Sequence, residues 1–279
     1  MRCIFCKQES STSITVEHII PESLGNKEYV LSPGIVCDRC NNYFSRKVEL
    51  PFLEHHGIKI LRFQEQLVNK KNNLPALPSI LSIGAVVNCQ PHFGKQNSIK
   101  FPGMTDEQEE RLKSKNTLMI TTEGFSDKTP LPEGNIVSRF LAKIALEAYV
   151  YLVARNNNEI NEIVDYPELD LLRNHARKGT TPNWPYSIRY IYDTDARWKT
   201  PDGGNTQILH ELDFLYTDNH ELYCIFVLLG IEFVINMVGP GIDGYSEWLK
   251  QHDNICPLSY GHRGEMREKR FLCMINPRR

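Results

Sequence analysis

Cys3-Ile-Phe-Cys6 and Cys37-Asp-Arg-Cys40 determine the predicted fold of the N-terminal segment, because each run has the Cys-x-x-Cys spacing of a zinc knuckle. Thirty residues separate the two pairs, and together they supply the four thiolates that close a tetrahedral zinc site. A structural zinc has no open coordination position, so these four cysteines are expected to hold the fold. The chemistry is therefore expected between the two pairs. We interpret the remaining, single cysteines as buried thiols.

The segment between the cysteine pairs predicts a strand, a loop, a strand and a helix. Residues Ser13 to Ile20 are rich in β-branched side chains and predict the first strand. A short return strand is expected at 34–36 and a helix from Asn41. Adjacent residues of a regular strand face opposite sides, so Glu17 and His18 share one site only if the strand twists, bulges or ends there. We predict such an irregularity near His18.

Three short runs resemble the HNH nuclease family, whose ββα-metal fold is often braced by a four-cysteine zinc site. The runs are Glu17-His-Ile-Ile-Pro21, Leu24-Gly-Asn26 and Val36-Cys-Asp-Arg-Cys-Asn-Asn42. The resemblance covers roughly the first 50 residues. It implies an endonuclease that hydrolyses phosphodiester bonds and uses a catalytic Mg²⁺ or Mn²⁺ ion beside the structural Zn²⁺.

The resemblance assigns catalytic roles to three residues. His18 matches the general base that takes a proton from the attacking water, and an imidazole with an ordinary pKa near ~6.5 suits that task. Glu17, at a position more commonly Asp in the family, and Asn41 match the ligands of the catalytic divalent ion. Carboxylate and amide oxygens are ligands that Mg²⁺ accepts.

Supporting positions follow the family pattern less closely. The family's central Asn, which buttresses the loop, falls on Ser32 here, and Asn26 is a candidate to take over that task. Ser45 lies one helical turn after Asn41 and is a candidate phosphate contact. Three basic residues flank the site and are candidate nucleic-acid contacts: Arg39, Arg46 and Lys47.

Charge does not mark the chain as a general polyanion binder. The net charge is −2, and residues 1–55 carry six Lys/Arg against seven Asp/Glu. Nucleic acid would therefore be held by local patches. The segment from His262 onward is one such patch, with a surplus of four basic residues, although solvent exposure alone also explains it.

The remainder of the chain predicts a larger α+β domain, so the fold class is α+β with an N-terminal ββα-metal module. We place the HNH-like module at 1–55, a connecting helix and linker at 56–75, and the larger domain at 76–279. Asn135 to Arg155 has apolar residues at helical spacing and predicts the long core helix. Short connections among later strand candidates predict an antiparallel sheet packed on it. Those candidates are 186–192, 208–216, 222–229 and 231–238, and an earlier strand is expected at 80–89.

The sequence therefore predicts a divalent-metal-dependent endonuclease that acts on DNA in preference to RNA, in phage defence or restriction. The larger domain is left open between substrate recognition, homo-oligomerisation and signal sensing. Two alternatives remain: a non-catalytic zinc ribbon that binds nucleic acid or protein, and an RNA-cleaving effector. No apolar run reaches the ~18 residues of a membrane span, and no signal segment precedes Cys3, so a cytoplasmic location is expected.

Overall fold

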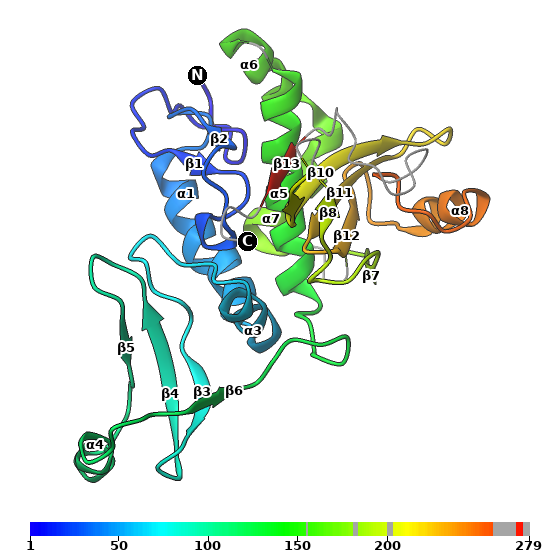
Figure 1. The fold of residues 1–279 in the computed structure, drawn as a ribbon. Coiled ribbons are helices and arrows are strands. Elements are labelled where there is room, and N and C mark those ends of the chain that lie inside the picture. The colour runs from blue at the N-terminus through cyan, green and yellow to red at the C-terminus, as the bar shows by residue number, and fades with distance from the viewer. Residues whose placement is uncertain (155, 181–183, 200–202, 259–271, 276–279) are drawn as a thin grey trace. The chain divides into compact units, whose positions relative to one another are not determined.

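The computed structural model describes residues 1–154, 156–180, 184–199, 203–258 and 272–275, the last four as backbone only. The chain forms two compact units (Figure 1). Unit 1 comprises Met1–Ile20, Asn26–Glu49 and Glu133–Arg279, and unit 2 comprises Pro21–Gly25 and Leu50–Pro132. The α+β class is confirmed. The boundaries at 55 and 75 were predicted for domains that fold independently, and compact units do not test independent folding. These boundaries therefore stay a prediction. Most of the basic segment from His262 lies outside the described residues.

Unit 1 begins with a small ββα element. Strand β1 (Glu17–His18) pairs antiparallel with β2 (Val30–Leu31), and helix α1 (Asp38–Phe44) follows. The ladder ends at His18, which agrees with the expected irregularity there. The strand is therefore two residues long rather than eight.

Two boundaries in this element differ from the sequence-based expectation. The return strand lies at Val30–Leu31 and not at 34–36, because Gly34 adopts a left-handed φ of 93° inside a turn. The helix begins at Asp38 and not at Asn41, because the Cys37 side chain accepts a hydrogen bond from the backbone N–H of Cys40 and caps the helix. The two knuckle cysteines thus lie at the helix N-terminus.

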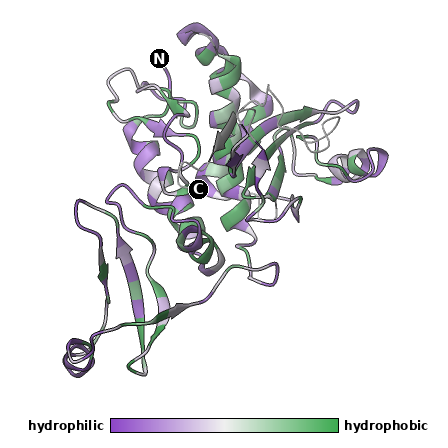
Figure 2. Cartoon of the chain, viewed as in Figure 1, coloured by the Kyte–Doolittle hydropathy of each residue, from purple (hydrophilic) through white to green (hydrophobic). Residues whose placement is uncertain are grey.

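Helix α5 (Asn135–Val153) is the long core helix that its apolar spacing predicted. It contacts α7 (Asp170–Lys178), the π-helical turn η2 (Ser45–Glu49) that follows α1, and the large sheet (Figure 1). Two further elements connect α5 to α7: α6 (Asn157–Asp165) and η3 (Pro167–Leu169). Figure 2 shows the contrast between the largely hydrophobic α5 and the hydrophilic α4 of unit 2.

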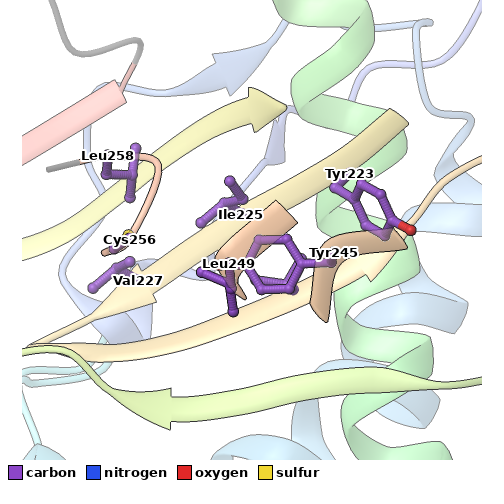
Figure 3. Close-up of a cluster of buried hydrophobic side chains, with 8 residues drawn as sticks. Tyr223, Ile225, Val227, Tyr245, Leu249, Cys256 and Leu258 are labelled. Atoms are coloured by element: carbon purple, nitrogen blue, oxygen red, sulfur yellow. The ribbon is translucent and has the colours of Figure 1, made fainter. Parts of the chain in front are cut away.

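The large sheet of unit 1 is antiparallel, as predicted, with strand order β13-β10-β11-β12-β7. Every side chain of β11 from Tyr223 onward is buried, because the sheet is covered on both faces. Phe226 meets Phe140 of α5 on one face, and Tyr223, Ile225 and Val227 pack against α8 on the other (Figure 3). The strands and the second covering helix are β7 (Tyr186–Tyr190), β10 (Ile208–Tyr216), β11 (Leu222–Leu228), β12 (Ile231–Asn236), β13 (Leu272–Ile275) and α8 (Asp243–Gln251); β8 (Trp198–Lys199) and β9 (Asn205–Thr206) form a separate pair.

Unit 2 is a four-stranded antiparallel sheet with strand order β5-β4-β3-β6. The strand predicted at 80–89 is in fact a hairpin, because Gly84 takes a left-handed φ of 77° and turns the chain. Helix α4 begins at a capping box formed by Thr105 and Gln108. The elements are η1 (Glu22–Leu24), α2 (Leu50–Leu53), α3 (His56–Gln64), β3 (Leu77–Leu81), β4 (Ala85–His92), β5 (Ser98–Lys100), α4 (Asp106–Lys113) and β6 (Ile120–Thr122). In the part of the chain that the structure describes, no helix is both long and apolar enough to cross a membrane.

Two buried imidazoles predict that the protein loses stability in mild acid. Burial lowers the pKa of His175 to about 4 and that of His210 to about 3. In the unfolded chain an imidazole has a pKa of about 6.5, so the unfolded state binds more protons between these values. The stabilisation is therefore present above pH ~6.5 and is lost as the pH falls towards ~4. The loss in the free energy of unfolding reaches about 2 kcal/mol per imidazole at pH ~5.

Urea unfolding at pH ~7 and ~5 measures this loss. His210→Leu is expected to lose less stability than wild type between the two values, whereas His56→Leu, at an exposed position, is expected to behave as wild type. Acid-induced zinc release lowers the stability of the variant and of wild type alike. It therefore cancels when the two proteins are compared at the same pH. Equal pH dependence in His210→Leu and wild type contradicts the assignment of His210.

Candidate active site in the N-terminal module

The four predicted zinc ligands converge in the structure. The Sγ atoms of Cys3, Cys6, Cys37 and Cys40 all lie within 4.8 Å of one another. Backbone N–H groups donate to two of them, from Cys37 to Cys3 Sγ at 3.3 Å and from Cys40 to Cys37 Sγ at 3.4 Å. The set has the ligand number and spacing of a closed structural zinc site.

The electrostatics of the cluster fit a bound cation. A hydrogen bond from Cys40 lowers the pKa of the Cys3 thiol to about 5, and the same contact, with burial, raises the pKa of Cys40. Thiolates this close repel one another, so one of them ionises at the expense of the others. A divalent ion removes that conflict, because it stabilises all four thiolates together.

His18 lies at the end of β1 with a half-buried side chain. Its Nδ1 atom is buried. The backbone carbonyl of His18 accepts a hydrogen bond from Lys143 Nζ at 2.8 Å. The predicted base is therefore held through its backbone at the end of the strand.

Glu17 points into the protein interior. Its side chain is 6% exposed, and Oε1 lies 2.8 Å from Nζ of Lys143, a fully buried residue of α5. The same ammonium lies 2.7 Å from Glu49 and 2.9 Å from Glu147. Burial alone would lower the pKa of Lys143, but the three carboxylates raise it well above its usual value, so the residue is charged. Burial raises the pKa of Glu147, which favours its neutral form.

Asn41 lies beside the start of β1. Its Nδ2 donates to the carbonyl of Val16 at 3.1 Å, so α1 is tied to the residue directly before Glu17. Ser45, one turn later, is exposed at the start of the π-helical turn. Arg39, Arg46 and Lys47 are also exposed, and the structure leaves all three accessible to a polyanion.

The predicted pair of divalent-ion ligands does not form one open oxygen site in this arrangement. The Glu17 carboxylate faces a buried ammonium, whereas the Asn41 amide lies at the surface against a backbone carbonyl. A divalent ion at Glu17 would lie next to the charge of Lys143, and the two cations would repel each other. The role of Glu17 and Asn41 as ion ligands stays a prediction, and no catalytic step is derived from it.

Asn26, and not Ser32, buttresses the loop between β1 and β2. The Asn26 side chain is fully buried; Nδ2 donates to the carbonyls of Ile20 and Tyr29, and Oδ1 accepts from the backbone N–H groups of Glu28 and Tyr29. Ser32 is exposed at the rim of a cavity of about 290 Å³. Its backbone carbonyl closes the turn by accepting from Ile35 N–H.

Asn26→Ala is expected to destabilise unit 1 by about 3 kcal/mol or more, because it removes four hydrogen bonds and leaves buried backbone groups unpaired. Urea unfolding of the zinc-loaded protein measures the loss. Asn42→Ala, at an exposed position of α1, is the matched control and is expected to stay within about 0.5 kcal/mol of wild type. Similar unfolding midpoints for both variants contradict the buttressing role.

Helices far along the chain complete the module. Arg173 of α7 is buried and donates from Nε to the carbonyl of Ile4, inside the first knuckle, at 2.7 Å. Arg2 pairs with Asp165, and Lys7 Nζ lies 2.6 Å from Asp170. Sequence reasoning missed these contacts. No local pattern signals them, because the partners lie far apart in the chain.

Comparison with known proteins supports the class of this module. Residues 3–56 match the profile of a family described as HNH endonuclease. The N-terminal segment is thus an HNH-type module with a four-cysteine cluster, and the resemblance drawn from its motifs is confirmed. The family match indicates a nuclease-type function. No curated protein and no solved structure matches the chain significantly.

Proposed function

We propose that the N-terminal module is an endonuclease that hydrolyses phosphodiester bonds with His18 as general base. The observation that carries the proposal is the position of His18, half-buried at the end of β1, within the segment that matches the HNH family. The zinc cluster fixes the chain on both sides of this strand, and Asn41 ties α1 to it. These features support the proposal that the strand carrying the reactive imidazole is held in a fixed position.

The proposed reaction needs a proton acceptor beside a water molecule. Neutral His18 removes a proton from that water, whose oxygen then attacks phosphorus, and the P–O bond to the leaving sugar oxygen breaks. The leaving oxygen takes up a proton. Exposed Arg39, Arg46 and Lys47 supply positive charge that attracts the phosphate backbone without reading its sequence.

DNA is the proposed substrate in preference to RNA, in a setting of phage defence or restriction, as the family resemblance implies. The large sheet with its covering helices is the proposed part for substrate selection, self-association or signal sensing. The near-neutral net charge favours recognition through local patches over general attraction to polyanions.

The test incubates the purified, zinc-loaded chain with supercoiled plasmid, linear duplex DNA and structured RNA. Each substrate is tried with Mg²⁺, with Mn²⁺ and with EDTA, because the resemblance implies a divalent ion. We expect DNA to be nicked or cut in the presence of a divalent ion, and a matched preparation of His18→Ala to be inactive. Equal cleavage by both preparations assigns the activity to another residue or a contaminant.

A non-catalytic binding module is the second candidate. It is favoured by the engagement of the Glu17 carboxylate with Lys143 in the buried interior, away from solvent. This candidate predicts that the protein shifts nucleic acid in a gel but cleaves none of the substrates under any ion condition. Binding that is equal in wild type and His18→Ala, with no cleavage, supports it over the nuclease.

A further inference from the structure

One lysine and three glutamates of unit 1 meet in its buried interior, and we call them the Lys143 cluster: Lys143, Glu17, Glu49 and Glu147. The ammonium lies 2.8, 2.7 and 2.9 Å from oxygens of the three glutamates in that order. It also lies 2.8 Å from the carbonyl oxygen of His18 and 3.5 Å from that of Ile19. Five oxygens therefore surround one cation.

The ligands of this cation come from three separate segments. Glu17 and the His18 carbonyl belong to β1, Glu49 ends the π-helical turn η2, and Glu147 lies one turn after Lys143 on α5. A wide π turn is uncommon, and here it places Glu49 within reach of α5. The cluster thus joins the strand that carries the proposed base to the end of the α1–η2 segment and to the core helix.

An ammonium with three N–H donors suits a set of oxygens in this arrangement. Buried carboxylates require a nearby positive charge, and Lys143 supplies it from within the chain. Its side chain is fully buried, and the side chains of Glu17 and Glu49 are 6% and 12% exposed. Nζ therefore lies against Oε1 of Glu17, and a metal ion bound to this carboxylate would lie next to the charge of the ammonium.

We propose that Lys143 is a positioning residue of the nuclease site, which binds Glu17 in place of a divalent ion and holds the backbone of His18. The inference rests on the proposed function, because it concerns the orientation of the proposed base. The β1–β2 ladder is two residue pairs long and ends at His18, so the Lys143 hydrogen bond fixes the strand at the point where the ladder stops.

Mn²⁺ binding tests the replacement of the ion. Electron paramagnetic resonance measures Mn²⁺ bound to the full-length, zinc-loaded protein without nucleic acid, for wild type, Glu17→Gln and the exposed control Glu162→Gln. We expect the Mn²⁺ affinity of Glu17→Gln to stay within twofold of wild type. If neither protein binds Mn²⁺ detectably, that result also agrees with the proposal. A Mn²⁺ ion that binds wild type and is weakened more than tenfold by Glu17→Gln overturns the replacement.

A triple variant tests the positioning role. Lys143→Met leaves unpaired buried carboxylates by itself, so it is combined with Glu17→Gln and Glu49→Gln. Glu147 is retained, because burial raises its pKa and favours its neutral form. We expect kcat to fall 10- to 100-fold with a change in KM below threefold, and the imidazole resonances of His18 to shift in histidine-labelled protein while those of His92 do not. An unchanged kcat with unmoved His18 resonances overturns the role.

The two proposals fail in distinguishable ways. If wild type cleaves no nucleic acid, the proposed function fails, whereas the His18 resonances still report whether Lys143 positions that residue. If the triple variant does not fold, the Mn²⁺ comparison between wild type and Glu17→Gln still decides whether Glu17 binds an ion.

Discussion

Cys37→Ser is expected to release the zinc ion and unfold the N-terminal module. Each knuckle supplies half of the ligands, and Cys37 also caps α1 through its sulfur, so its loss removes a ligand and a helix cap together. Zinc binding in small modules contributes an apparent ~10–16 kcal/mol at neutral pH, and this binding energy is folding energy. The effect therefore exceeds that of any single buried contact.

Metal content and amide-exchange protection of residues 1–49 measure this effect in the full-length protein. Cys89→Ser is the matched control, because Cys89 is also a buried free thiol but lies in β4 of unit 2, outside the cluster. It is expected to keep one equivalent of zinc. If Cys37→Ser keeps its zinc and wild-type protection as well, the cluster is not the metal site.

His18→Ala is expected to lower the single-turnover cleavage rate about 10²- to 10⁴-fold, which is the usual contribution of a general base. The fold is expected to survive, because the side chain is half-buried at a strand end and Lys143 binds the backbone carbonyl, which alanine retains. Zinc content and the unfolding midpoint therefore stay near those of wild type. Substrate binding is also expected to change little.

The control for His18 is His56→Ala, because His56 is an exposed imidazole that pairs with Glu123 in unit 2. Its cleavage rate is expected to stay within twofold of wild type. The wild-type rate is also expected to rise with pH through one ionisation, since only the neutral imidazole accepts a proton. Equal cleavage rates for wild type and His18→Ala would show that His18 is not the general base.

Local sequence predicted those elements whose cause is local. Apolar spacing predicted α5 almost to its bounds. Strand β10 was predicted to the residue, because β-rich runs with short connections leave few alternatives. Two of the errors occurred where a turn residue was not recognised, at Gly34 and Gly84, since a left-handed φ interrupts a strand that composition alone would extend.

The candidate site divides in the same way. Two Cys-x-x-Cys pairs predict a metal site because the spacing by itself brings two sulfurs to one ion, and the four sulfurs do converge. The surroundings of Glu17 could not be predicted, because its partner Lys143 lies on a helix formed much later in the chain. His18 and Lys143 are 125 positions apart, and no local pattern connects them.

The sequence by itself thus determined the four-cysteine cluster, the class of the N-terminal module and the core helix, because each depends on spacing within one segment. Only the tertiary structure decided that Glu17 faces a buried ammonium, that Arg173 holds the first knuckle, and that Asn26 supports the loop. These outcomes depend on which distant groups share a buried volume, where every charge and hydrogen-bonding group requires a partner. These partners come together only in the packed chain, so no single segment of the sequence specifies them.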